Sequence, residues 1–516
     1  MDKKNTSRKE NSIRNIMYGI GGQLLSNFLS FINRTVFINT IGVTYLGISG
    51  LFTNIFSFLS FAELGIGSAI AYSLYEPLAK NDEEKICALM KWYKRAYEVI
   101  GLIIAGVGIS LVPILPDLIK GRPDVENLSI YYLIMLGTTV ASYFFTYKRT
   151  IILCDQKAYI NSRNTYIFSS AQMIVQVALL ILFKNYILYL IVAGLFTVAS
   201  NIAISLKADQ LYPYLKKKTT SKIDVETSKT IRKNVAAMVL HKISGIIVYS
   251  SDNVIISKFI GLLEVGIYSN YYMVITVLTN LLGQVFTAIT ASVANLQVLT
   301  EKEVVYKKFQ GIYFLNFWIV TVFTTCLYVL WDDFIRIWLG DDFLMDHLAV
   351  VVLVFWFYNQ SMRHTVGVFK NSAGLYWNDR YKPLAESIIN LVTSIILLKF
   401  FGIAGVFMGT VISLMTTSFW VEPYIIYKHI FKIKLRTFFI SYFKYMAVCF
   451  GIVVITSFVT GLLPEMNFFI WVLKGIISVI FSSFGVFAIF RNTMEFKEAL
   501  PLLEPVKNKL KGLKRH

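Results

Sequence analysis

The chain has 516 residues, of which 56% are hydrophobic and 16% are charged, and its formal net charge is +19. Its mean hydropathy of +0.59 is high for a soluble domain, because soluble domains are only about half apolar. This composition excludes a soluble globular protein and predicts an integral membrane protein. Four widely spaced cysteines, without a CxxC pair, argue against a metal site and against a disulfide framework.

Fourteen apolar segments, each long enough to cross a hydrocarbon core of about 30 Å, follow one another along the chain. Segments of this length are expected to be helices, because lipid offers the backbone no hydrogen-bond partner. We therefore predict an all-α polytopic membrane protein with about 14 transmembrane helices. The predicted spans are 15–41, 46–75, 96–119, 129–152, 166–183, 187–206, 235–259, 265–295, 311–331, 347–372, 384–400, 403–426, 439–461 and 468–490.

Lysines and arginines are distributed unevenly between the two sides of the predicted membrane. Of the 50, 39 lie in the eight segments that share a side with both termini. By the positive-inside rule that side is cytoplasmic, and the first span is too long for a cleaved signal peptide. Topology therefore accounts for the basic net charge, and no nucleic-acid partner is expected. The basic tail is either an interfacial segment that binds anionic lipid or a solvated tail.

The chain contains an internal repeat. A shift of 219 residues places "IGVTYLGI" at 41–48 over "IGLLEVGI" at 260–267, and a shift of 222 places "DQKAYINSR" at 155–163 near "WNDRYKPLAES" at 377–387. Such self-similarity predicts two lobes of about six helices in the same orientation, related by a pseudo-two-fold axis along the membrane normal.

This repeat sets the expected domain plan. We predict a six-helix lobe, a basic cytoplasmic linker, a second six-helix lobe, two additional transmembrane helices and a basic cytoplasmic tail, at 1–206, 207–234, 235–426, 427–490 and 491–516 respectively. Within the second lobe, Gly405 and Gly409 have GxxxG spacing, which predicts close helix packing.

The first span carries a stripe of polar residues. Gln23, Asn27, Ser30 and Arg34 follow one another at i, i+4, i+7 and i+11, which is one face of a helix. An arginine at bilayer depth costs roughly 2.5 to 3.5 kcal/mol on insertion scales. Either the stripe lines a water-filled cavity, or Arg34 snorkels to the outer headgroups. Snorkelling does not account for Gln23 and Asn27, so the pattern favours a cavity.

Other spans contain ionisable residues, which usually face a bundle interior or a transport pathway. Glu63, His241 and His364 are our candidates for coupling to H⁺ or Na⁺, since an ionisable group withdrawn from water can exchange a proton near neutral pH. Each is otherwise explained as a structural ion pair or as a core polar group with its hydrogen bonds satisfied. No metal site and no organic cofactor are predicted.

The segment "INRTVFINTIGVTYLGISGLFTNIFSFLSFAELGIGSAIAYSLYEPLA" at 32–79 and the loop "LCDQKAYI" at 153–160 carry a family resemblance. The chain resembles polysaccharide-transport members of the multidrug/oligosaccharidyl-lipid/polysaccharide exporter superfamily, and looks most like bacterial flippases for capsule, O-antigen or exopolysaccharide repeat units. The resemblance implies a V-shaped pair of lobes around a cationic cavity and alternating access. It also implies an undecaprenyl-diphosphate-linked oligosaccharide cargo that moves from the inner to the outer leaflet of the plasma membrane.

A lipid-linked diphosphate is a dense anion, and guanidinium groups bind phosphate oxygens bidentately. We therefore predict that Arg34 and Arg363 face one central cavity and bind the diphosphate. The further predicted cargo ligands are Gln23, Asn27, Lys242 and Asn359.

The 219-residue shift lays Asn33 and Arg34 over Asp252 and Asn253. This correspondence predicts an ion pair between Arg34 and Asp252 that closes the outer side while the cavity is open to the cytoplasm. We expect a monomer that works with membrane lipids and with a polysaccharide polymerase and other assembly proteins.

Two other functions remain open. A drug or cation exporter of the same superfamily would share the fold, but it should favour acidic and aromatic cavity residues. A membrane polymerase or glycosyltransferase of the same pathway would need an extracytoplasmic platform, whereas the outer connections are short. An ATP-driven pump is excluded because the chain has no Gly-Lys dipeptide for a P-loop. The sequence thus favours a transporter over an enzyme.

Overall fold

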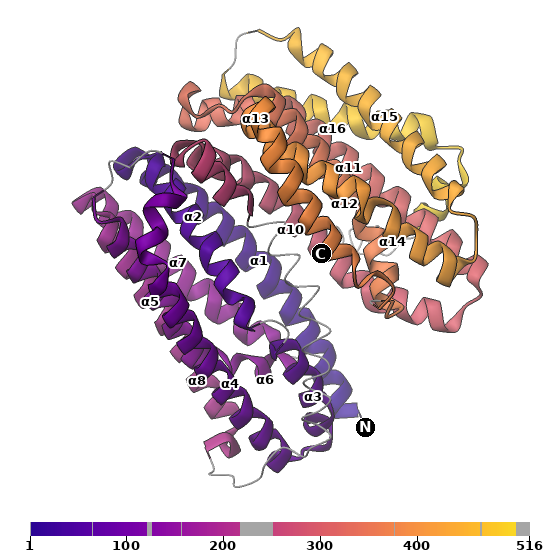
Figure 1. Ribbon diagram of the computed structural model, residues 1–516. Coiled ribbons are helices and arrows are strands. Elements are labelled where there is room, and N and C mark those ends of the chain that lie inside the picture. Colours follow the sequence, from indigo (N-terminus) through magenta and orange to yellow (C-terminus); the bar gives the residue numbers. More distant parts are fainter. Residues whose placement is uncertain are drawn as a thin grey trace, which may run out of the picture. The chain divides into compact units, whose positions relative to one another are not determined.

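The computed structural model describes residues 2–63, 66–120, 126–155, 157–216, 251–375, 377–464 and 467–501 (Figure 1). Over these ranges the chain is helical and contains no strand, which confirms the predicted all-α class. Two compact units form, Met1–Gly266 and Ile267–His516. The predicted linker lies largely outside the described residues, as do His241 and Lys242, and the predicted domain boundaries stay a prediction.

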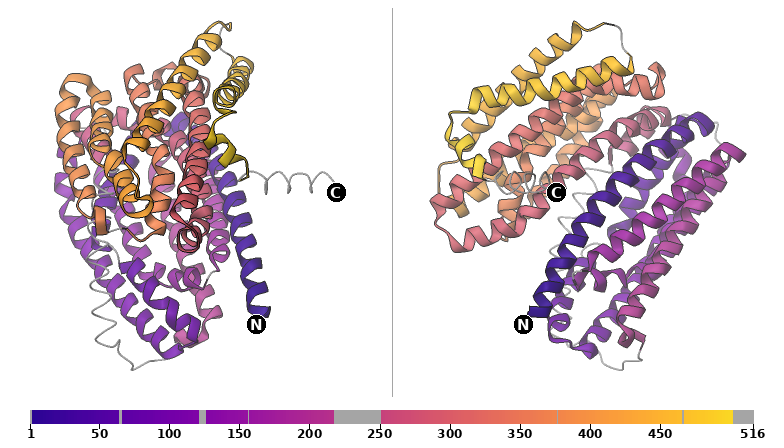
Figure 2. Two further views of the ribbon diagram at one scale, coloured as in Figure 1. Left: turned by 90° about the vertical axis from the view of Figure 1, so that its right-hand side faces the viewer. Right: turned by 180° about the vertical axis from the view of Figure 1, so that it is seen from behind.

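The first unit is built from eight helices within the described ranges, together with the helical residues 251–259. These helices are α1 (Asp2–Ile41), α2 (Val43–Leu59), α3 (Ile66–Lys80), α4 (Glu83–Ser110), α5 (Leu128–Thr146), α6 (Arg149–Cys154), α7 (Ala158–Phe183) and α8 (Tyr186–Leu211). Within this unit α1 packs along α7, and α8 packs against both α5 and α7 (Figure 2). The second unit contains α10 (Leu262–Leu299, which begins in the first unit), α11 (Lys302–Leu339), α12 (His347–Ser372), α13 (Lys382–Thr416), α14 (Ser418–Ile426), α15 (Arg436–Gly461) and α16 (Phe468–Phe490).

Several of these helices can cross a membrane. Among the described residues, seven helices are long and apolar enough to do so, and two bent helix pairs raise the number to nine. The predicted multi-pass membrane protein is therefore confirmed, whereas the predicted number of fourteen spans is not.

Glycines define the turn inside α13 and the packing of its two halves. Gly402 has φ 56, a value that L side chains rarely adopt, and it breaks the helix between two predicted spans. A Cβ at Gly405 would lie 2.2 Å from the Leu397 carbonyl oxygen, and one at Gly409 would lie 2.5 Å from the Ser394 amide nitrogen. The predicted close packing at both glycines is confirmed, because only hydrogen leaves room for the facing backbone.

The two additional helices dock on α11 through aromatic rings. Phe317 of α11 stacks on Tyr445 of α15 with 4.3 Å between ring centroids, and it meets Phe490 of α16 edge-on at 5.6 Å. Lys474 of α16 also donates to Asp333 of α11 at 2.8 Å. These contacts attach α15 and α16 to the second unit.

Candidate functional site

Arg34 lies on α1 next to an aromatic wall of α8. Its neighbour Asn33 is buried and donates from Nδ2 to the Tyr189 hydroxyl at 3.0 Å. Tyr189 packs edge-on against Phe37 at 4.9 Å and lies close enough to Arg34 to interact with it electrostatically. Arg34 is half-buried, so this part of α1 is held against protein. Its predicted role in cargo binding stays a prediction.

The rest of the polar stripe on α1 contacts α7. Gln23 donates from Nε2 to the Asn27 Oδ1 at 2.8 Å and accepts a hydrogen bond from the Tyr166 hydroxyl at 3.2 Å. Ser30 lies 3.7 Å from the sulfur of Met173. The structure thus places Gln23 and Asn27 in a polar seam within the first unit, where they hydrogen bond to each other and Gln23 also bonds to Tyr166.

Glu63 lies at the centre of a tyrosine cluster. The Tyr97 hydroxyl donates to its Oε1, and the Tyr143 hydroxyl donates to its Oε2 at 3.0 Å. Tyr93 extends this series of hydrogen bonds, since its hydroxyl lies 3.0 Å from that of Tyr97 and 3.2 Å from that of Thr150. Within the described ranges no lysine, arginine or histidine forms an ion pair with Glu63. Its two carboxylate oxygens are therefore satisfied by neutral hydroxyl groups.

The loop after α6 forms a second polar cluster in the first unit. Asp155 pairs with Lys157 at 2.7 Å and accepts a hydrogen bond from the Tyr212 hydroxyl at 2.7 Å. Burial, and then this hydrogen bond, raise the pKa of the Tyr212 phenol above its ordinary value. Nearby Lys148 donates to both carboxylate oxygens of Asp209, each at 2.7 Å. The bond to Tyr212 ties the loop to the end of α8, and the Lys148–Asp209 pair ties the start of α6 to α8.

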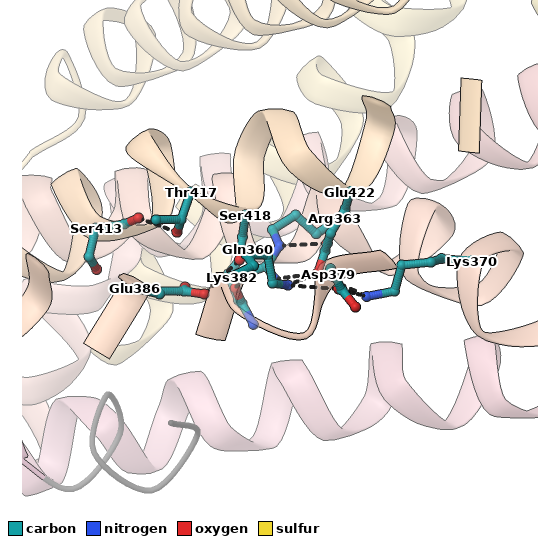
Figure 3. Close-up of polar contacts among 10 residues, drawn as sticks. All are labelled: Gln360, Arg363, Lys370, Asp379, Lys382, Glu386, Ser413, Thr417, Ser418 and Glu422. Atoms are coloured by element: carbon teal, nitrogen blue, oxygen red, sulfur yellow. Dashed lines mark hydrogen bonds and ion pairs between the residues drawn. The ribbon is translucent and has the colours of Figure 1, made fainter. Parts of the chain in front are cut away.

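The second unit holds a buried cluster of charges around Glu422 of α14 (Figure 3). Arg363 of α12 binds this carboxylate bidentately, with Nε 3.2 Å from Oε2 and an Nη 3.0 Å from Oε1. Its other Nη donates to the Gln360 side-chain oxygen at 2.7 Å. Glu422 is only 5% exposed, so its negative charge depends on these protein donors.

Two lysines complete the cluster. Lys370 of α12 pairs with Asp379, and its Nζ also lies 3.6 Å from the Glu422 carboxylate. Lys382 of α13 pairs with Glu422, and its Nζ also lies 3.5 Å from the Asp379 carboxylate. Both lysine side chains are 8% exposed and that of Asp379 is fully buried. Glu386 adds a hydrogen bond from Ser418 at 2.6 Å. The cluster joins α12, α13 and α14, and three cations face two buried carboxylates at its centre.

The remaining predicted site residues lie apart from this cluster or within protein packing. Asn359 is buried, accepts a hydrogen bond from the Tyr442 hydroxyl and donates to the Phe355 carbonyl oxygen at 2.7 Å. These bonds indicate that Asn359 helps to attach α15. His364 stacks on Phe286 with 5.3 Å between ring centroids, and Asp252 of the first unit is buried. Among the described residues, no group of His, Cys, Asp and Glu could hold a metal ion.

Sequence reasoning missed most of the charge cluster. It selected Arg363, but it counted Lys370 and Lys382 only as positive charges of a cytoplasmic loop and overlooked Glu422. A signal was present, because Glu422 interrupts the apolar run "SFWVEPYII" of α14. A carboxylate in such a run needs a cationic partner, and its partners lie 40 to 59 residues away in the chain.

Comparison with known proteins identifies the family. The family model described as "Polysaccharide biosynthesis protein" matches residues 12–292, which is more than half of the chain. The chain belongs to this polysaccharide biosynthesis protein family. The resemblance that the sequence predicts is thus confirmed. No curated protein sequence matches the chain.

Solved structures of transporters share the fold of this family member. A lipid II flippase, MurJ in an inward closed conformation, matches with a TM-score of 0.68 and 14% identity over 92% of this chain and 99% of that chain. The Vibrio cholerae MATE transporter VcmN matches with a TM-score of 0.57 and 12% identity, over 82% of this chain and 99% of its own. A multidrug resistance MATE family transporter of the MOP superfamily matches with a TM-score of 0.53 and 14% identity, over 76% of this chain and 91% of its own. The fold is therefore the two-lobed helical fold of these transporters.

Proposed function

We propose that this family member is a flippase, which moves an undecaprenyl-diphosphate-linked oligosaccharide from the inner to the outer leaflet of the bacterial plasma membrane. It would serve capsule or exopolysaccharide assembly by alternating access, with both termini in the cytoplasm. The observation that carries the proposal is a polysaccharide biosynthesis family match on a chain whose fold is that of a lipid II flippase. A polysaccharide polymerase and other assembly proteins would then be its functional partners.

Each unit contributes an arginine suited to a phosphate cargo. Arg34 and Arg363 carry planar guanidinium groups that can bind two phosphate oxygens at once, and both are partly withdrawn from water. Arg363 is already bound bidentately by Glu422 and by Gln360. A diphosphate that approaches Arg363 must therefore compete with Glu422 for the guanidinium. Such competition would let cargo binding alter the contact between α12 and α14.

Glu63 is the best supported candidate for ion coupling. Its carboxylate receives two tyrosine hydroxyl groups, which can donate to a carboxylate and accept from a carboxylic acid. A proton or a sodium ion can therefore bind there without leaving a buried cation unpaired. His364 has a ring partner, Phe286, and is a weaker candidate. We retain the Arg34 to Asp252 ion pair as a candidate outer gate, on the strength of the repeat and of the burial of Asp252.

Reconstitution tests this function directly. Proteoliposomes should flip a fluorescent undecaprenyl-diphosphate-linked oligosaccharide from one leaflet to the other, measured as loss of protection from an impermeant quencher. Arg34→Lys should lower the rate about tenfold or more, because a point charge cannot replace the bidentate fork. Arg95→Lys, at an exposed position, is the control. If the protein instead exports a cationic dye and leaves the lipid unmoved, the drug-exporter alternative holds.

A further inference from the structure

Two turns of the chain each have a glycine with positive φ and the same backbone hydrogen bond. Gly42, between α1 and α2, has φ 98, and Gly261, directly before α10, has φ 153. The Gly42 amide donates to the Phe37 carbonyl oxygen at 3.4 Å, and the Gly261 amide donates to the Ile256 carbonyl oxygen at 2.9 Å. The shift of 219 residues superposes Gly42 on Gly261 and Phe37 on Ile256. The internal repeat therefore reproduces this turn, and the positive φ values favour glycine in both copies.

The helices that follow the two turns contact each other reciprocally. A Cβ at Gly47 of α2 would lie 2.0 Å from the carbonyl oxygen of Leu262, and a Cβ at Gly266 of α10 would lie 2.4 Å from the carbonyl oxygen of Val43. The same shift relates Gly47 to Gly266 and Val43 to Leu262. Each helix thus presents its glycine to the first residue of the other helix. All four residues belong to the first unit.

Glycine is needed at both positions because the atom that an added Cβ would meet first is a backbone carbonyl oxygen of the facing helix. A carbonyl oxygen within a helix cannot rotate away from an added methyl group, so alanine would force the two helices apart. Close approach of glycine Cα–H groups to carbonyl oxygens is a recurrent feature of helix contacts in membranes. Val265 beside this contact is fully buried, as are Ile48 and Leu51, so the contact excludes solvent.

The contact lies at an end of the helices that the positive-inside rule assigns to the extracytoplasmic side. It joins the first repeat to the first turn of the second repeat, and an alternating-access carrier separates its repeats on that side in one part of its cycle. Backbone atoms form the closest part of this contact, so a small separation of the two helices is enough to open it.

We propose that Gly47 and Gly266 form a reciprocal clasp that seals the extracytoplasmic end of the transport pathway and opens once in each transport cycle. The clasp consists of Val43, Gly47, Leu262 and Gly266. This inference rests on the proposed flippase function only for the identity of the cargo that passes when the clasp opens. The contact itself is tested without any cargo.

Labelling of a buried cysteine measures opening of the clasp. Val265→Cys replaces a fully buried side chain with a smaller one, and an impermeant maleimide should react with it slowly in membrane vesicles. The wild-type chain, with its four native cysteines, gives the background. Adding Gly47→Ala or Gly266→Ala should each speed labelling about 5- to 150-fold, since overpacking shifts the clasp toward the open form. The control is Gly106→Ala, whose Cβ would have no atom within 4 Å.

Equal effects of the two alanines are expected because the contact is reciprocal. Unchanged labelling in both alanine variants would overturn the clasp. An effect of Gly106→Ala as large as theirs would also overturn it, because a general loss of packing would then explain the result.

A disulfide tests whether the clasp must open during transport. A Cβ at Gly50 would lie 3.3 Å from Cγ1 of Val265, so Gly50→Cys with Val265→Cys should form a disulfide under oxidation. In proteoliposomes with the fluorescent undecaprenyl-diphosphate-linked oligosaccharide, the oxidised double variant should lose flipping and regain it on reduction. Each single variant serves as a control.

The outcomes separate this inference from the proposed function. A cross-linked protein that flips at the rate of its reduced form contradicts the clasp, and so does a pair that fails to cross-link. If the wild-type chain flips no lipid-linked oligosaccharide while the labelling results hold, the proposed cargo is wrong and the clasp stands.

Discussion

Glu63 in the first unit and Glu422 in the second are both carboxylates withdrawn into helical packing, but their neighbours differ. Glu63 receives hydrogen bonds from two tyrosine hydroxyls, and within the described ranges no cation pairs with it. Glu422 is bound by Arg363 and Lys382, and Lys370 lies 3.6 Å away. One carboxylate is solvated by neutral groups and the other is neutralised by cations.

The difference indicates two different tasks. Protonation of Glu422 would leave Arg363, Lys370 and Lys382 with too little counter-charge, so the cluster favours the charged carboxylate. The tyrosine hydroxyls around Glu63 can reverse their hydrogen bonds, so they can serve a charged or a neutral carboxyl group. Glu422 is thus suited to fixing the arrangement of α12, α13 and α14, whereas Glu63 is the carboxylate that we propose for ion coupling.

Two lysines at equivalent positions of the repeat also differ in their burial and in the number of carboxylates near them. The 222-residue shift superposes Lys148 on Lys370. Lys148 pairs with one carboxylate and its side chain is 19% exposed, whereas Lys370 is 8% exposed and lies near two carboxylates. The repeat conserves a lysine at this position, but only the second unit buries it in a network.

Removal of the Glu422 charge should have the largest effect. Glu422→Gln leaves Arg363, Lys370 and Lys382 with a single central counter-charge at Asp379, and it should destabilise the protein by about 3 to 5 kcal/mol. The measurement is thermal unfolding in detergent, followed by intrinsic fluorescence. Glu303→Gln, at an exposed position of α11, is the matched control and should unfold like the wild-type protein. An unchanged Tm for Glu422→Gln would mean that the cluster does not hold the unit together.

The equivalent lysines should rank in the order of their burial. Lys370→Met leaves the fully buried carboxylate of Asp379 with Lys382 alone, at 3.5 Å, and should cost about 3 kcal/mol, whereas Lys148→Met should cost about 1 kcal/mol. Both values come from the same unfolding assay, with exposed Lys94→Met as the control. If Lys148→Met proved the more damaging change, the comparison of the two units would have to be reversed.

Loss of the Tyr143 hydroxyl should have a smaller effect. Tyr143→Phe deletes the 3.0 Å hydrogen bond to Glu63 and should cost about 0.5 to 1.5 kcal/mol. Tyr358→Phe is the matched control, because the buried Tyr358 hydroxyl has no hydrogen-bond partner among the described residues. The control should therefore be neutral or slightly stabilising. Equal costs for the two variants would show that the bond to Glu63 contributes nothing.

Neutralising Glu63 should change stability least and coupling most. Glu63→Gln keeps an oxygen acceptor for a tyrosine hydroxyl, so the free energy of unfolding should change by about 1 kcal/mol or less. The rate of flipping should lose its response to an imposed pH or sodium gradient. Glu98→Gln, a partly exposed acid of the same unit, should keep that response. A response that survives in Glu63→Gln would exclude Glu63 as the coupling site.

Local patterns in the sequence predicted part of this arrangement. The positions of Arg34, Glu63 and Arg363 within apolar spans marked them as unusual, and the structure places each among specific polar or aromatic side chains. The amide of Asn359 carried the same signal, yet it hydrogen bonds to Tyr442 of α15. A polar residue in a span reports that a partner is needed, but it does not report whether that partner is cargo or another helix.

The sequence by itself predicted the membrane class, the internal repeat and the close packing at Gly405 and Gly409, because hydropathy, self-similarity and residue spacing can be read from the chain alone. Only the tertiary structure decided which charges meet. Glu422 binds Arg363 across 59 residues and Lys382 across 40, and loop lysines that count as surface charges in the sequence become buried counter-ions. Such pairings depend on which helix faces pack together, and they persist because a charge buried without its counter-ion costs several kcal/mol.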